Sequence, residues 1–519
     1  MDNPKSPSDR GLFFILRYLG IVLTLMVILT STLIGSPVWA AIELTPGEIP
    51  PNDFRISHMG PDGDTSCIAS NSAVAYNSQR DEFLVVWQGY IQGSVFNPGG
   101  TEIYGQLIDG ATASLIGNMK RISFMGLDGD NNYLAFRPDV TYNSTRNEFL
   151  VVWEGNENTV IPNINEYEIW GQRLSYNVFG GLVLTGSELR LSNMGPDGDP
   201  AFLPYRPAVA YNHIKDEYLV VWEGDDNTPP LVDGEKEIFG QYMAYAGDLF
   251  GYLGADFRIS YMGPNGNPNS DALSPDIAVN ETDEEYLVVW HGNENPIGQD
   301  DEIWGRLILA NRSFEPQQKY SDMGTGESDF FANNPAVTYN PDAAEWLIVW
   351  EGNKEFPVRW EIFGQFLGYT AGGLLDQTGI DDFRISDMGP DGNPSYNAYS
   401  PKVDYDPLKK KYLIVWYGVD NTGTLENFEQ EIFGQLIDAD TRAEVGYNDF
   451  RLSDMGPMGD NDYMASNPSV AYSNMHSNFL ITWEGDDNIA PLVNDEIEIF
   501  GQRYSVRLPV FLPLVFKDS

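Results

Sequence analysis

The sequence has few of the residues on which most catalytic and metal-binding chemistries depend. Of its 519 residues, one is cysteine, Cys67, and four are histidine. A single cysteine excludes an internal disulfide framework, so stability has to come from packing or from bound ions. The four histidines are separated by irregular intervals, and their spacing predicts no Ser-His-Asp arrangement. Zinc-ligand spacing and a phosphate-binding glycine loop are also missing from the sequence.

Positive charge is scarce as well. The chain has 30 Lys and Arg residues against 76 Asp and Glu residues, which gives a formal net charge of -46. Binding to nucleic-acid phosphates needs clustered Lys and Arg, so this balance argues against a nucleic-acid partner and against an anionic membrane surface. A strongly negative protein can bind cations or basic partners, and its self-repulsion also keeps it soluble.

Long hydrophobic runs are confined to the two ends of the chain. Residues 18–35 form an apolar run that follows Lys5, Arg10 and Arg17 and precedes a small-residue site at residues 38–40. This order predicts a signal peptide over residues 1–40, with an uncleaved anchor as the alternative. The apolar C-terminal tail, residues 506–519, is too short to cross a bilayer. We therefore expect a protein without a membrane span after cleavage, either secreted and extracellular or held at the cell surface.

One short segment recurs seven times along the rest of the chain. Its best copy is Glu-Tyr-Leu-Val-Val-Trp-Glu-Gly at residues 217–224, and its tryptophan returns at intervals of 60 to 69 residues. A repeat of this length decides the architecture before any local reading is attempted. The seven tryptophans are Trp87, Trp153, Trp222, Trp290, Trp350, Trp416 and Trp483. Because they share one strand position, we expect them in the core rather than on a sugar-stacking platform.

Each repeat carries four strand signals separated by turn residues. In the third repeat these are residues 207–211, which open with proline, the Trp strand at 218–222, a strand at 237–241 that opens with glutamate, and a strand at 257–260. The Trp strand is apolar on both faces, so other sheets have to cover both. Seven four-stranded units of this kind predict an all-β, seven-bladed β-propeller over residues 54–505, with four antiparallel strands per blade and a linker at 41–53.

The order of the signals also predicts how the ring closes. The chain begins with a fourth-strand signal that has no blade before it, and its last repeat ends after a third strand. Pairing the N-terminal strand with the C-terminal blade completes that blade and removes an exposed edge. The regular Glu of strand three and Arg of strand four then form cross-strand pairs. Glu102 pairs with Arg121 in the first blade, and closure requires Glu498 to meet Arg55.

In its strand pattern over residues 54–505 the chain resembles secreted bacterial-type seven-bladed β-propeller repeat proteins. It lacks the Gly-His and Trp-Asp pairs of WD repeats, the Asp-box of sialidases and the Asp-x-Asp-x-Asp-Gly loop of integrin-like calcium blades. The resemblance therefore implies a fold and a repeat architecture, without a specific characterised family or activity.

Acidic loops follow the fourth strand of most repeats, typified by Met-Gly-Pro-Asp-Gly-Asp at residues 59–64. Gly-Pro and Asp-Gly form tight turns, which is one interpretation. The other is calcium binding, because the loops place hard oxygen ligands two residues apart. The candidate metal ligands are Asp62, Asp64, Asp128, Asp130, Asp197, Asp199, Asp391 and Asp460.

A second set of acidic loops follows the Trp strand and emerges at the same end of each blade. Together the two sets predict one strongly negative face around a central funnel, which is the default binding surface. Aromatic residues in the loops of this face are candidates for stacking against a carbohydrate or peptide. They are Tyr133, Phe202, Tyr205, Phe330, Tyr396 and Tyr463.

These features favour an exported, monomeric, non-enzymatic binding propeller that recognises a glycan or protein ligand through its acidic face, with calcium as a candidate stabilising ion. The first alternative is a glycan-active hydrolase or lyase with two carboxylates in the channel. The second is a structural surface protein. An enzyme should break the sevenfold pattern at the channel, whereas a scaffold should keep it.

Overall fold

The computed structural model describes residues 47–91, 100–126, 132–156, 166–196, 199–226, 229–294, 301–324, 330–354, 358–390, 393–420, 429–457, 460–487 and 490–506. The fold described below is that of the unit Pro46–Ser519. The predicted signal peptide and the tail beyond Val506 lie outside the described residues. Within the described ranges the chain contains no helix with the length and apolar character needed to cross a bilayer.

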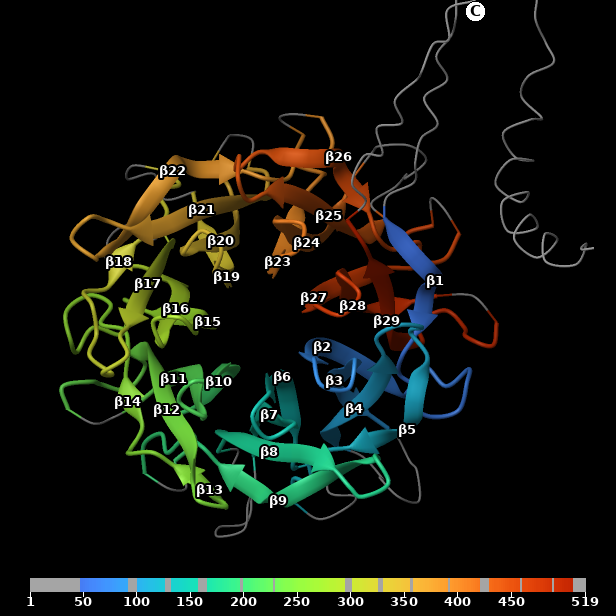
Figure 1. Cartoon of the computed structure of the whole chain (residues 1–519), viewed down its shortest axis with the longest axis horizontal. Helices are drawn as coiled ribbons and strands as arrows, with labels where there is room; N and C mark the ends of the chain where they lie inside the picture. Colours follow the sequence, from blue (N-terminus) through green and yellow to red (C-terminus); the bar gives the residue numbers. More distant parts are fainter. Residues whose placement is uncertain are drawn as a thin grey trace, which may run out of the picture. The chain divides into compact units, whose positions relative to one another are not determined.

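Seven antiparallel sheets of four strands stand in a ring around a central channel, which confirms the predicted seven-bladed β-propeller (Figure 1). In blades 1 to 6 the chain runs from the innermost strand outward, and in blade 7 the first three strands do so. Blade 1 contains β2 (Ile68–Asn77), β3 (Glu82–Tyr90), β4 (Thr101–Asp109) and β5 (Leu115–Arg121). Blade 2 contains β6 (Ala135–Asn143), β7 (Glu148–Gly155), β8 (Glu168–Tyr176) and β9 (Leu182–Arg190). Blade 3 contains β10 (Pro204–Asn212), β11 (Glu217–Asp225), β12 (Lys236–Ala246) and an outer strand in two pieces, β13 (Leu249–Tyr252) and β14 (Phe257–Arg258).

The other four blades repeat this plan. Blade 4 contains β15 (Ala272–Asn280), β16 (Glu285–Gly292), β17 (Glu302–Ile308) and β18 (Gln318–Lys319). Blade 5 contains β19 (Ala332–Asn340), β20 (Glu345–Gly352), β21 (Glu361–Tyr369) and β22 (Leu375–Arg384). Blade 6 contains β23 (Ala398–Asp406), β24 (Lys411–Val419), β25 (Gln430–Asp438) and β26 (Glu444–Arg451). Blade 7 contains β27 (Ala465–Ser473), β28 (Asn478–Asp486), β29 (Ile497–Tyr504) and, from the other end of the chain, β1 (Glu48–Arg55).

The ring closes as predicted, because β1 pairs antiparallel with β29 and Arg55 lies opposite Phe500. One boundary differs from the prediction. Strand β1 begins at Glu48, so it includes residues 48–53, which were predicted to be linker. The pairing of β1 with β29 has a register shift between Ile49 and Phe54, and Glu48 pairs with Tyr504.

The core lies between neighbouring blades. All seven repeat tryptophans have 0% exposed surface, which confirms that they are core residues. A methionine from the loop before each blade covers several of them. The indole nitrogen of Trp222 lies 3.5 Å from the sulfur of Met194, and Trp483 lies 3.3 Å from Met455. The methionine of the acidic loop therefore has a structural role, because it packs against the tryptophan in the core between two blades.

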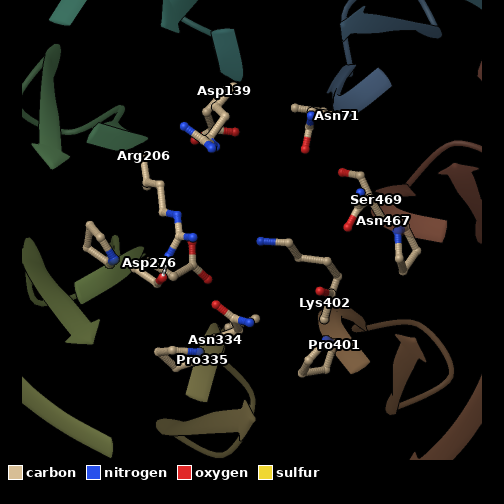
Figure 2. Close-up of a pocket in the computed structure, with 18 of the residues that line it drawn as sticks. Asn71, Asp139, Arg206, Asp276, Asn334, Pro335, Pro401, Lys402, Asn467 and Ser469 are labelled. Carbon is tan, nitrogen blue, oxygen red and sulfur yellow. Dashed lines mark hydrogen bonds between the residues drawn. The ribbon is translucent and has the colours of Figure 1, made fainter. Parts of the chain in front are cut away.

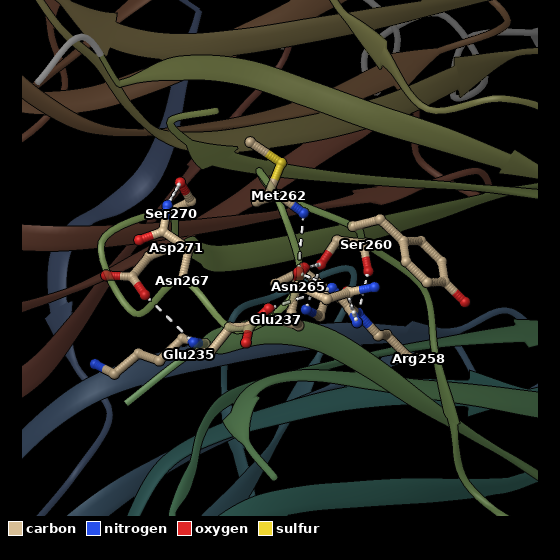
Figure 3. Close-up of polar contacts among 12 residues, drawn as sticks. Glu235, Glu237, Arg258, Ser260, Met262, Asn265, Asn267, Ser270 and Asp271 are labelled. Atoms are coloured by element: carbon tan, nitrogen blue, oxygen red, sulfur yellow. Dashed lines mark hydrogen bonds and ion pairs between the residues drawn. The ribbon is translucent and has the colours of Figure 1, made fainter. Parts of the chain in front are cut away.

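A buried glutamate organises the outer part of each blade, as Figure 3 shows for blade 3. Glu237 on β12 accepts hydrogen bonds from the Arg258 guanidinium, from the Ser260 hydroxyl and, at 2.9 Å, from the Met262 amide. Glu102 and Arg121 form the same ion pair in blade 1. At the ring closure Glu498 accepts from Arg55 and from the Met59 amide at 2.9 Å. These pairs fix the loops that lead from one blade to the next.

Candidate functional site

The innermost strand of every blade is bent at the channel by a register shift. One residue at each bend has a left-handed backbone conformation, with φ between 45° and 51°. These residues are Asn71, Arg137, Arg206, Ser274, Asn334, Ser400 and Asn467. None is glycine, and such conformations are retained where the surroundings enforce them, often at functional sites.

At six of these seven positions, a side chain from the preceding blade accepts a hydrogen bond from the backbone amide of the left-handed residue. Glu154, directly after Trp153, accepts the backbone amide of Arg206 at 2.9 Å. Glu223 accepts the amide of Ser274 and Glu351 that of Ser400, both at 2.6 Å. Glu484, Gln88 and His291 accept the amides of Asn71, Arg137 and Asn334 in the same way.

The acidic loops predicted after the Trp strands include those that begin at Glu154, Glu223 and Glu484, and the interpretation of these three glutamates changes. Glu154 and Glu223 are buried, and their carboxylates hold the bends of the neighbouring inner strands. Glu484 is buried enough that desolvation raises its pKa. Part of the acidic charge that was assigned to a binding face therefore supports the channel wall instead.

The bends form a cavity of about 460 Å³ that all seven inner strands line (Figure 2). The residue that resumes the pairing after each bend faces this cavity, and it differs from blade to blade. In blade order these residues are Ala73, Asp139, Ala208, Asp276, Ala336, Lys402 and Ser469. Blades 2, 4 and 6 thus contribute two carboxylates and one ammonium at a position that is small in the other four blades. The sevenfold pattern breaks at the channel.

The two aspartates are held by the blade that follows. Asp139 Oδ2 accepts the backbone amide of Val209 at 2.8 Å, and Asp276 Oδ2 accepts that of Val337 at 2.8 Å. Each side chain keeps part of its surface open to the channel, yet the channel wall surrounds it. The resulting desolvation raises the pKa of Asp139 to about 6, and the negative charge of Asp276 adds to the rise.

Asp276 differs from Asp139 in its relation to Lys402. Desolvation also raises the pKa of Asp276, but the positive charge of Lys402 is the main influence that opposes this rise. At Asp139 the effect of Lys402 is the smallest of the influences. The positive charge of Lys402 therefore favours the anionic form of Asp276 more than that of Asp139.

Three basic side chains reach the same cavity. Arg137 forms an ion pair with Glu154 at 2.5 Å, and Arg206 lies 3.9 Å from Glu223 while donating to the Ser274 hydroxyl. Among the described residues, no carboxylate lies within ion-pair distance of the Lys402 ammonium. Figure 2 shows Lys402 extended into the open centre of the channel.

Five of the six predicted stacking aromatics, all but Tyr205, pack against the hydrophobic cores between blades. Five of the six cover a glycine of their own loop, where a Cβ atom would meet the aromatic ring at 2.1 to 2.6 Å. The five pairs are Gly126 with Tyr133, Gly195 with Phe202, Gly324 with Phe330, Gly389 with Tyr396 and Gly456 with Tyr463. Tyr205 stands apart, with the Lys236 ammonium 5.9 Å from its ring centre. A role in ligand binding stays a prediction for all six.

The predicted metal ligands that the structure describes mainly stabilise turns. Asp64, Asp199 and Asp460 each accept a backbone amide two residues later, at 3.1 to 3.2 Å, and Asp62 forms an ion pair with Arg55 at 2.8 Å. Asp128, Asp130, Asp197 and Asp391 lie outside the described residues. In the part of the chain that is described, no three His, Cys, Asp or Glu side chains are grouped so that they could hold a metal ion. Calcium binding stays a prediction.

No family model matches the chain, and no curated protein matches it in sequence. Solved structures match it in fold. An α-L-arabinanase from Penicillium chrysogenum has a TM-score of 0.41 and 9% identity, covering 71% of this chain and 92% of that one. An α-L-arabinofuranosidase of family GH93 from Fusarium graminearum has a TM-score of 0.41 and 12% identity, covering 72% and 93%. A thermostable family-43 glycoside hydrolase has a TM-score of 0.34 and 13% identity, covering 63% and 97%.

The prediction of a non-enzymatic binding propeller is corrected on this comparison, because these structures are named as glycoside hydrolases. Their names agree with the alternative of a glycan-active hydrolase. These similarities concern the fold alone. The break in sevenfold symmetry at Asp139, Asp276 and Lys402 is the departure that was expected of an enzyme.

Proposed function

We propose that the protein is a glycan-active hydrolase whose active site is the central channel, with Asp139 and Asp276 as the catalytic carboxyl groups. The observation that carries this proposal is that two carboxyl groups, which the charge of Lys402 influences to different degrees, face one cavity of 460 Å³. Two carboxyl groups with different affinities for a proton are what glycoside hydrolysis requires.

The environments of the two groups assign their roles. Asp139, with a pKa of about 6, is the general acid that protonates the oxygen of the departing sugar. Asp276, which the charge of Lys402 favours as an anion, either attacks the anomeric carbon or activates a water molecule. The hydrogen bonds to Val209 and Val337 fix both side chains on rigid inner strands.

The test is hydrolysis of a panel of oligosaccharides, followed through the reducing ends released, by the wild type and by Asp139→Asn and Asp276→Asn. Loss of a general acid or a nucleophile is expected to lower the rate by about 10²-fold or more. Asp404→Asn is the matched control. Asp404 is also a desolvated carboxyl group on the inner wall, with a pKa of about 6, and it accepts the Tyr472 amide at 2.7 Å. Equal loss of activity in all three variants would indicate a structural role and contradict the proposal.

We also propose that this activity takes place outside the cytoplasm, which rests on the apolar run at residues 18–35 and the small-residue site that follows it. Fractionation of cells that express the full chain, with N-terminal sequencing of the product, tests this. Mature protein that begins at Ala41 in the exported fraction supports it, and full-length protein in the cytoplasmic fraction contradicts it.

A further inference from the structure

Lys402 and Arg206 are cations in a channel where the proposed chemistry needs carboxyl groups. They come from β23 and β10, in blades 6 and 3, and Figure 2 shows both side chains directed into the cavity from different walls. In a chain with 76 acidic and only 30 basic residues, cations at such a place are uncommon. The strand bends at Arg206 and Ser400 are held through their backbone amides, so these contacts do not use the Arg206 guanidinium or the Lys402 ammonium.

The ammonium group of Lys402 has no close carboxylate partner among the described residues. The ammonium acts at a distance on Asp139 and Asp276, but no described carboxylate comes within ion-pair distance of it. Arg206 is better supported, by the Ser274 hydroxyl and by Glu223 at 3.9 Å. The Lys402 ammonium has no ion-pair partner among the described residues and faces the same cavity as the Arg206 guanidinium, so both can form charge-assisted hydrogen bonds with an anionic group of a ligand.

We infer that the channel binds a glycan that carries a negative charge, and that Lys402, assisted by Arg206, binds the anionic substituent. This inference rests on the proposed function, since it names the class of glycan that the same site would take. The shared chemistry is a sugar with a carboxylate, as in a uronic acid, or with a sulfate ester. Asn71, Asn334 and Asn467 line the same cavity, where an amide oxygen can accept a hydrogen bond from a sugar hydroxyl. The amide nitrogens of Asn334 and Asn467 donate to Glu351 and Glu484.

The net charge of -46 makes this inference specific to the cavity. A protein with that charge repels polyanions at long range, so an acidic glycan cannot be retained through its general surface charge. Binding of an acidic oligosaccharide would therefore have to come from local contacts with the channel cations, and it should depend on Lys402 in particular.

The experiment measures equilibrium binding by calorimetry on the full chain carrying Asp139→Asn, so that turnover does not interfere. The probes are oligogalacturonate, a hyaluronan oligosaccharide, an alginate oligosaccharide and a chondroitin sulfate oligosaccharide, each beside its carboxyl-reduced or desulfated counterpart. The expected result is binding of at least one acidic probe with its neutral counterpart at least about tenfold weaker. Preference for a carboxylated or a sulfated probe identifies the substituent.

Lys402→Met should weaken that binding about tenfold to hundredfold, and Arg206→Met should weaken it less. Lys410→Met is the matched control, because Lys410 pairs with Asp440 at 2.9 Å in a turn away from the cavity. Equal binding of acidic and neutral probes, no binding of any acidic probe, or unchanged binding by Lys402→Met would overturn the inference. Hydrolysis of a neutral glycan by the wild type would overturn it as well, while leaving the proposed function standing.

Discussion

Replacing Arg55 with methionine should weaken the pairing of β1 with β29, which closes the ring. Arg55 forms an ion pair with Glu498, lies 3.6 Å from Glu496 and pairs with Asp62 at 2.8 Å. The side chains of Glu496 and Glu498 are 0% exposed, whereas that of Arg55 is 12% exposed. Removing the guanidinium leaves two buried carboxylates without their cation, which costs about 3 to 5 kcal/mol for fully buried pairs. Because Arg55 is partly solvated, we expect about 3 kcal/mol of lost unfolding free energy.

The matched variant is Arg121→Met, which removes the same contact with Glu102 inside blade 1. Its strand β5 belongs to a blade that is continuous in sequence, whereas β1 is joined to β29 only through pairing between the two ends of the chain. Both variants should lose stability in urea denaturation, but only Arg55→Met should expose residues near Glu48 to a protease under native conditions. Stability of Arg55→Met within about 0.5 kcal/mol of the wild type, or equal cleavage of the two variants, would refute this reasoning.

Three further predictions concern the loops and the buried acids. Gly195→Ala should destabilise the protein by about 1 to 3 kcal/mol in urea denaturation, because φ is +62° and the new Cβ would lie 2.4 Å from the Phe202 ring. Gly247→Ala, with φ +69° and no atom within 4 Å, reports the backbone strain alone and should cost less. Burial raises the pKa of Glu431 and of Asp449 to about 8, so the folded state binds protons more tightly than the unfolded state, whose carboxyl groups titrate near about 4. This stabilisation is complete below the unfolded pKa and is lost as the pH rises through about 8, so the urea midpoint should fall from pH 5 to pH 9, and a rising midpoint would contradict the account. If the loops of Asp64 and Asp199 bind calcium, the melting temperature of the protein should be lower in chelator than in calcium. An unchanged melting temperature would contradict calcium binding and support the interpretation of these loops as tight turns.

The architecture could be predicted from the sequence because each blade repeats the same physical solution. The Trp strand must be covered on both faces, and the unmatched strand signals at the two ends have only one way to pair. The Glu and Arg positions, which include Glu498 and Arg55, were visible for the same reason. Repetition across seven units makes a structural residue stand out.

The channel site could not be found in this way because a functional residue breaks the repetition. Asp139, Asp276 and Lys402 occupy one position of the first strand, which alternates along the chain between small and charged residues. That alternation was the available signal. The alternation can be interpreted only with the bend in each inner strand, because the bend turns this position toward the cavity. The local sequence does not predict the left-handed backbone of residues such as Arg206 and Ser274, on which the bends depend. The burial of Glu154 and Glu223 was hidden for the same reason, because it depends on contact with the next blade.

The most direct test of the catalytic pair is the pH dependence of kcat/KM for the oligosaccharide that the wild type hydrolyses fastest. A general acid with a pKa of about 6 has to be protonated to act, so the rate should fall as the pH rises above about 6. This alkaline limb should disappear in the residual activity of Asp139→Asn and persist in Asp404→Asn. An alkaline limb that stays the same in Asp139→Asn would contradict the assignment of Asp139 as the acid and, with it, the proposed catalytic pair.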